Sequence, residues 1–234
     1  LGASMLRERM VGAFNTLSKG AGTGVQDFER IKRLAFDFGA PLEDTVNQIL
    51  ALRRTGFAAD EAENLFKRLQ DLRRVGVSLE EMKGAVRAIT QIKNTGFLQG
   101  DELNELANAG VSVSDVYKQL GKRLGKTVPE IMKLKEAGKI AASDAIPAIE
   151  AAIAEMSGGK APGELGKKFA DTTATGMIER FRNIGGFLFD EIAKRIAPAF
   201  ESVAPILKDV MAAIESPQGV AVLDAIGGAS NGSY

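Results

Sequence analysis

Residues 121–127 form the part of this sequence closest to a catalytic motif. They read Gly-Lys-Arg-Leu-Gly-Lys-Thr, which approximates the loop that binds nucleotide phosphates through backbone N–H groups and a lysine. Only three residues separate the glycines where that loop has four, and a predicted helix precedes it instead of a strand. We therefore predict that a helix ends here and that Thr127-Val-Pro-Glu130 caps the start of the next helix.

The residue inventory restricts the remaining chemistry. The chain contains no Cys, no His and no Trp, which excludes disulfides, thiolate or imidazole metal sites, and nucleophiles activated by His. Carboxylate pairs such as Asp101–Glu102 and Glu80–Glu81 could act as acid and base, but each falls in the first turn of a predicted helix, where negative charge suits the macrodipole. We predict a protein without enzymatic activity, cofactor or metal.

Residues 103–122 imitate a DNA-reading helix-turn-helix. Val116 stands where such motifs need an apolar residue, and Lys118 and Lys122 supply local positive charge. However, Leu106 occupies a position where close helix packing usually requires Ala, and thirty acidic residues balance the thirty basic residues of the whole chain. We interpret this stretch as a packed helical hairpin with a solvated basic face, and we predict no specific nucleic-acid binding.

Helical periodicity dominates the elements that carry these residues, and the fold class is predicted to be all-α. Apolar stripes recur in 42–54 and 59–75, glycines punctuate the chain every dozen to twenty residues, and Ser78-Leu-Glu-Glu81 is a capping box. Thr55-Gly-Phe57 recurs as Thr95-Gly-Phe97, each before an acidic helix start. The repeats predict stacked helical hairpins that form a compact bundle.

Three regions follow from these patterns: a helical lead-in over 1–38, a helical-hairpin domain over 39–157, and a long, kinked helical arm with a flexible tail over 158–234. No run of eighteen apolar residues exists, so no simple membrane-spanning helix is expected. Because the first residue is Leu1 instead of Met, we expect a fragment of a longer polypeptide.

The arm carries an apolar face with interleaved arginines and lysines, so two interpretations stay open. It is either buried against the bundle or a neighbouring chain, which we favour because Asp190 and Glu191 interrupt the basic residues, or it contacts a membrane surface. The residues of this possible interaction face are Phe181, Ile184, Phe187, Phe189, Ile192, Ile196 and Phe200.

A longer pattern runs from Gln91 to Ile140. It comprises Gln91-Ile-Lys-Asn-Thr-Gly-Phe-Leu-Gln-Gly100, Asp101-Glu-Leu-Asn-Glu-Leu-Ala-Asn-Ala-Gly110, Val111-Ser-Val113, Leu120-Gly121, Val128 to Leu134 and Glu136-Ala-Gly-Lys-Ile140. The pattern resembles the helical region of phage tail tape measure proteins, and the resemblance covers about residues 39–157. Ser112 departs from it, because relatives often carry Pro there. The residues that define this family-like motif are Gly96, Gly100, Glu102, Leu103, Leu106, Gly110, Val113, Leu120, Gly121, Gly138 and Ile140.

The resemblance implies a structural virion protein that takes part in tail assembly and length determination and contacts the tail tip during genome delivery. It implies tail-tube, tail-tip or baseplate-hub and tail-assembly chaperone proteins as partners, and self-association in several copies. It also implies a place in the tail lumen or at the tail tip after synthesis in the host cytoplasm. Two alternatives remain: a free-standing α-helical adaptor, and a membrane-active helical protein.

Overall fold

The computed structural model describes residues 2–20, 22–159 and 161–183. They belong to a compact unit, Leu1–Ile184, that is separate from Gly185–Tyr234. Within the described ranges the fold is all-α, as predicted, and β structure is limited to an isolated bridge. The elements are α1 (Gly2–Leu17), α2 (Gly24–Phe38), α3 (Leu42–Arg54), α4 (Ala59–Gln70), the 3-10 helix η1 (Asp71–Val75), α5 (Leu79–Thr95), α6 (Gly100–Asn108), α7 (Val113–Leu124), α8 (Val128–Glu136), α9 (Ala142–Ser157), α10 (Glu164–Thr172) and α11 (Ala174–Asn183).

Several helices begin with the same local device. In α4, α5, α6 and α8 a Glu at the third helical position accepts a hydrogen bond from the N–H of the residue before the helix. The distances from donor to acceptor are 2.9, 2.7, 3.0 and 2.8 Å in that order. Each bond satisfies a backbone donor that the helix itself leaves free. The capping boxes predicted at residues 78–81 and 127–130 are confirmed.

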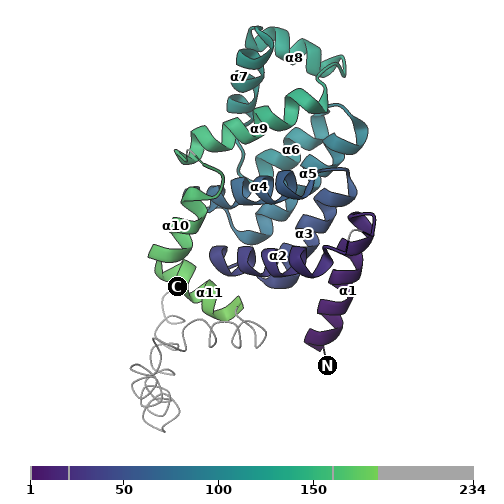
Figure 1. The fold of residues 1–234 in the computed structure, drawn as a ribbon. Helices are drawn as coiled ribbons and strands as arrows, with labels where there is room; N and C mark the ends of the chain where they lie inside the picture. Colours follow the sequence, from purple (N-terminus) through teal and green to yellow (C-terminus); the bar gives the residue numbers. More distant parts are fainter. Residues whose placement is uncertain (1, 21, 160, 184–234) are drawn as a thin grey trace. The chain divides into compact units, whose positions relative to one another are not determined.

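Consecutive helices pack in pairs, from α1 and α2 at one end of the unit to α7 and α8 at the other (Figure 1). The α9 helix then returns and contacts α7, α5, α4 and η1. It contains Pro147, which cannot donate the usual helical bond to the Ser143 carbonyl. Arg123 of α7 donates to that carbonyl instead, at 3.3 Å, so the proline is accommodated by a neighbouring helix.

The core is continuous along these helices and holds the predicted apolar stripes. Each large side chain removed from water there contributes about 1.5–3 kcal/mol. Among the most deeply buried are Phe14, Phe28, Phe66, Ile31, Ile49, Leu50, Leu52, Leu65, Leu69, Leu72, Met82 and Ile89.

The α10 and α11 helices pack on α2, α4 and η1, although the sequence placed them in an extended arm. Asp71 of η1 is fully buried and accepts hydrogen bonds from the backbone N–H groups of Gly163, Leu165 and Gly166, each at 3.0 Å. It also accepts one from Arg68. A carboxylate about ninety residues away thus caps the first turn of α10, where a negative charge is favourable.

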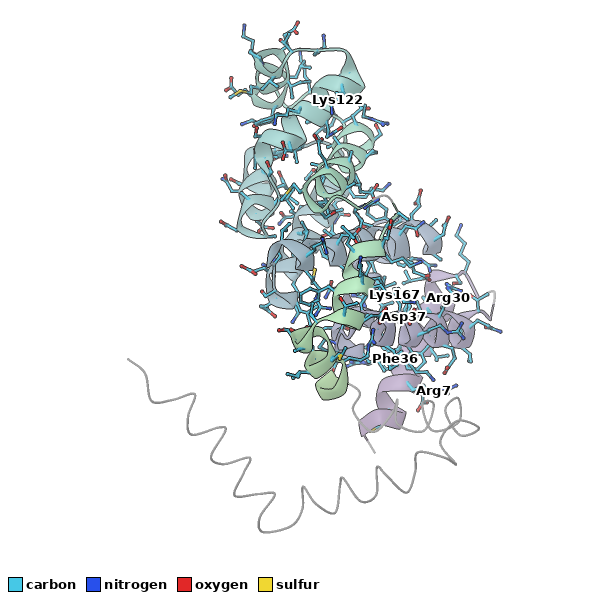
Figure 2. The ribbon with its side chains drawn as sticks, turned by 90° about the vertical axis from the view of Figure 1, so that its left-hand side faces the viewer. Arg7, Arg30, Phe36, Asp37, Lys122 and Lys167 are labelled. Carbon is cyan, nitrogen blue, oxygen red and sulfur yellow. The ribbon has the colours of Figure 1, made fainter. Side chains whose placement is uncertain are left out.

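Two arginines complete this packing by binding the last carbonyls of α2. Arg180 donates to the carbonyls of Phe36 and Asp37, at 3.1 and 2.8 Å, and Arg73 donates to that of Phe38 and to Glu179. Burial lowers the pKa of Arg73, with Glu179 opposing the shift. Lys167 and Asp37 form an ion pair at 3.7 Å across the same junction (Figure 2). The described part of the predicted arm is therefore folded against the bundle.

Candidate functional site

The stretch that resembled a phosphate-binding loop is a helix end. Gly121 lies inside α7, Gly125 ends that helix, and Thr127 caps α8. A Cβ on Gly121 would lie 2.7 Å from the carbonyl oxygen of Lys126, whose N–H donates to the Gly121 carbonyl at 3.0 Å. Gly121 therefore permits a close approach between two backbone segments, which accounts for the glycine.

The stretch that resembled a helix-turn-helix forms α6 and α7, but they are not a packed hairpin. The α7 helix packs mainly on α9 and has few contacts with α6, so the predicted pairing was wrong. The physical reason is that α9 is built largely from Ala and Ile and offers more apolar surface than the nine-residue α6. Lys118, Lys122 and Arg123 on α7 form ion pairs with Asp115, Glu155 and Asp144.

The two ends of the family-like motif meet through the isolated bridge. The Leu98 N–H donates to the Ile140 carbonyl at 2.9 Å, and the Ala142 N–H donates to the Gly96 carbonyl at 2.8 Å. This antiparallel pairing joins the segment before α6 to the segment after α8. Residues more than forty positions apart are thus held side by side, which the spacing of the motif alone did not indicate.

The motif residues divide into a buried set and a set at helix ends. Glu102, Leu103, Leu106, Leu120 and Ile140 are buried, and Val113 is half-buried at the start of α7. Gly96, Gly110 and Gly138 have positive φ in the turns after α5, α6 and α8, Gly100 opens α6, and Gly121 lies in α7. The roles of these residues in folding explain why the motif has these residue types. That they also act together as a functional set stays a prediction.

Of the possible interaction face, only Phe181 falls within a described helix, α11, and Ile184, Phe187, Phe189, Ile192, Ile196 and Phe200 lie outside the described residues. Among the described helices none is long and apolar enough to cross a membrane. The described residues also hold no cluster of three or more acidic side chains placed to bind a metal ion.

Sequence reasoning missed an exposed surface beside the bridge. Phe97 is 47% exposed, and Val128 and Met132 on α8 are 37% and 44% exposed. An open hollow of about 390 Å³ is lined by Phe97, Gln99, Gly100, Lys135, Glu136 and Gly138. The available signal was the composition of α8, a nine-residue helix in which apolar residues and lysines alternate.

A second hollow lies between α4, α5 and α9 and contains Glu150. Burial raises the pKa of the Glu150 carboxyl, with Arg68 opposing the shift and Glu61 adding to it. Lys93 lies over the Phe57 ring, with its Nζ 4.7 Å from the ring centroid, on the wall of the same hollow. A raised carboxyl pKa is common to catalytic acids and to ordinary burial, and desolvation alone explains its direction here.

A family model described as tape measure protein matches residues 7–194 of this chain. The chain is also similar to a curated protein, the probable tape measure protein of Salmonella phage Felix O1 (isolate Felix O1-VT1), at 27% identity over 159 residues. That match covers 67% of this chain and 21% of the relative, so the chain spans about a fifth of the relative's length. No solved structure matches the chain.

Proposed function

Because this chain belongs to the tape measure protein family, whose members are structural proteins of phage tails, we propose that it forms a compact domain that accompanies the length-determining part of the protein. In this role it takes part in tail assembly and length determination and contacts the tail tip during genome delivery. The observation that carries the proposal is the overlap between the family match, residues 7–194, and the described helical bundle.

We call the length-determining helical part of the protein the ruler. Because the helices of this chain fold back on one another, they favour a domain beside the ruler and not a piece of the ruler itself. A helical ruler gains about 1.5 Å per residue along one axis. Even α5, the longest of the described helices with 17 residues, spans only about 26 Å on that basis. The chain also reverses direction at α9 and is closed by the packing of α10 and α11 on α2 and η1.

The partners that fit this role are tail-tube proteins, the tail-tip or baseplate hub, and a tail-assembly chaperone, with several copies of the protein in one tail. We place the protein in the tail lumen or at the tail tip. The exposed apolar residues Phe97, Val128 and Met132 and the adjoining hollow support a role in binding such proteins.

Cross-linking mass spectrometry on purified tails tests the location and the partners. We expect peptides from residues 94–118 to be present and linked to tail-tube or tail-tip proteins. If the tails lack the protein, or if it occurs only in cytoplasmic complexes, the adaptor interpretation replaces this one.

An insertion tests whether this domain lies beside the ruler or forms part of it. Gly158 lies in an exposed turn between α9 and α10, and such turns tolerate insertions. Twenty inserted Gly and Ser residues at this turn should leave tail length unchanged in electron micrographs. The matched control is an insertion of about 20 helical residues into an extended ruler segment, which should lengthen the tail by about 30 Å. Equal lengthening from both insertions would contradict the proposal.

A further inference from the structure

The α8 helix has an apolar face that the bundle does not cover. It packs mainly on α7, and Ile131 is its only buried residue. Val128 and Met132 are four residues apart and therefore lie on the same side of the helix, and Glu136 continues that row. An amphipathic helix normally turns its apolar stripe inward, so this exposed row is unusual.

Of this row, Glu136 lines the hollow beside the bridge. Lys135 and Glu136 line it from α8, and Phe97 and Gly100 line it from the segment that starts α6. The antiparallel bridge of Phe97 with Ala141 joins the segments that carry these two walls. Phe97, Val128, Met132, Lys133 and Lys135 are called the α8 surface below.

The same region concentrates positive charge. Residues 118–139 contain seven basic and two acidic residues, a net charge of +5 in a chain whose total is zero. Lys118, Lys122 and Arg123 form ion pairs with other residues of the chain, and Figure 2 shows Lys122 at the end of the unit remote from Lys167. Within the part of the chain that the structure describes, Lys126, Lys133, Lys135 and Lys139 form no ion pair.

We propose that the α8 surface binds an acidic amphipathic helix of another tail protein. The apolar side chains of that helix pack on Met132 and Phe97 and enter the hollow, and its carboxylates meet Lys126, Lys133, Lys135 and Lys139. Only the assignment to a tail protein rests on the proposed function. The acidic and amphipathic character of the partner follows from the surface itself.

Three other occupants fit less well. A second copy placed with α8 against α8 would bring together two copies of residues 126–139, each with four lysines and two glutamates, which is repulsive. A nucleic acid would leave Phe97, Val128 and Met132 facing phosphates. A membrane would have to enter an open hollow and accept Glu130 and Glu136 at its surface.

Zero-length carbodiimide cross-linking tests the proposal, because it joins a lysine amine directly to a carboxylate in contact with it. The full protein is cross-linked in purified tails and, in parallel, in extracts of infected cells. We expect Lys133, Lys135 or Lys139 to be joined to Asp or Glu side chains spaced three or four residues apart on another tail protein. If lysines elsewhere in the chain cross-link and these three do not, the proposal is wrong.

Two variants check that the links reflect binding through this surface. Met132→Glu and the double change Lys133→Glu with Lys135→Glu should each abolish the links. They should also weaken binding of a synthetic peptide of the linked helix at least tenfold. Met177→Glu is a matched control because Met177 is also 44% exposed but lies on α11, and Lys168→Glu is the charge control on α10. Circular dichroism confirms that all variants remain folded.

The remaining outcomes are also decisive. Peptide binding that the α8 variants do not change overturns the proposal. So does binding to anionic phosphatidylserine vesicles or duplex DNA that the α8 variants abolish while peptide binding persists. If tails contain the protein without α8 links, this inference fails and the proposed function stands. If tails lack the protein, the proposed function fails and the links in the extract still decide the inference.

Discussion

Two helix starts in this protein begin with the same three residues but bury different side chains. Thr55-Gly-Phe57 leads into α4, and Thr95-Gly-Phe97 leads into α6. Gly56 and Gly96 both adopt positive φ, +96° and +81°, which suits glycine because it lacks a Cβ. Phe57 is 8% exposed and lies under Lys93, whereas Phe97 is 47% exposed beside the hollow.

The difference comes from one additional residue. Ala58 caps α4 directly after its phenylalanine, but Leu98 stands between Phe97 and Gln99, the cap of α6. The position before the cap packs against the fourth helical residue, which is Ala62 in α4 and Leu103 in α6. Phe57 and Leu98 therefore occupy equivalent buried positions, and Phe97 lies outside the core. Burial follows the distance to the helix start, and the additional residue leaves the Phe97 ring exposed.

Alanine substitutions at the two phenylalanines should give the largest contrast. Phe57→Ala is expected to lower the free energy of unfolding by about 3–5 kcal/mol, because it removes a buried ring and leaves a cavity. Phe97→Ala should change it by less than about 0.5 kcal/mol. Urea unfolding followed by circular dichroism measures both. Similar losses for the two variants would mean that the repeats are equivalent after all.

Leu98 is the residue that replaces Phe57 in the second repeat, so its truncation tests the shifted register. Leu98→Ala should cost about 2–4 kcal/mol, since Leu98 is buried and its backbone is bonded to Ile140. Phe97→Leu, the neighbouring conservative change, is the control and should be close to neutral. A small effect at Leu98 combined with a large one at Phe97 would reverse our assignment.

The capping glutamates extend the comparison, with a smaller expected change in the free energy of unfolding. Glu102 accepts the Gln99 N–H and is buried, whereas Glu61 accepts the Ala58 N–H from an exposed position. Glu102→Ala should destabilise the protein by about 1 kcal/mol, and Glu61→Ala by less because solvent already screens that bond. The same unfolding measurement ranks the two variants, and the reverse order would show that burial does not strengthen this cap.

The smallest effect is a pH dependence at two further helix starts. Hydrogen bonds from Ser78 lower the pKa of Glu81, and hydrogen bonds from Thr127 lower the pKa of Glu130. A carboxyl whose pKa is lower in the folded state stabilises the fold above its ordinary pKa, and this stabilisation is lost as the pH falls through the lowered value. Carboxyl NMR titration should show that Ser78→Ala raises the pKa of Glu81 alone and that Thr127→Ala raises the pKa of Glu130 alone. Each rise should be partial, because the change removes the hydroxyl donor and keeps the backbone N–H donor. Movement of both groups in either variant would show that the two starts are coupled.

Much of the fold could be predicted because its determinants are local. The helix starts at Ser78 and Thr127 depend on groups three residues apart, so the sequence indicates them directly. The partner of α7 could not be predicted in this way. Several helices offer apolar stripes, and only the assembled core decides that α9 supplies the largest surface.

The α8 surface likewise has one part that the sequence predicts and one part that only the tertiary structure decides. Periodicity predicts that residues 128–136 form a helix, but it cannot tell whether the apolar row of that helix faces the core or solvent. The hollow beside that helix depends on the antiparallel bridge of Phe97 with Ala141, which joins the segments before α6 and after α8. That bridge joins backbone groups, and a backbone hydrogen bond leaves little trace in side-chain identity.

By itself the sequence determined the all-α class and the ends of the helices, because caps, glycines and apolar spacing act over a few residues. Its inventory without Cys and His also removed most catalytic chemistry, and its motif indicated the family. Only the tertiary structure decided that Asp71 caps α10, that Arg73 and Arg180 bind the end of α2, and that Phe97 remains exposed. The two caps join groups far apart in the chain, and so does the bridge of Phe97 with Ala141. Which distant groups meet is set by the path of the whole chain through space.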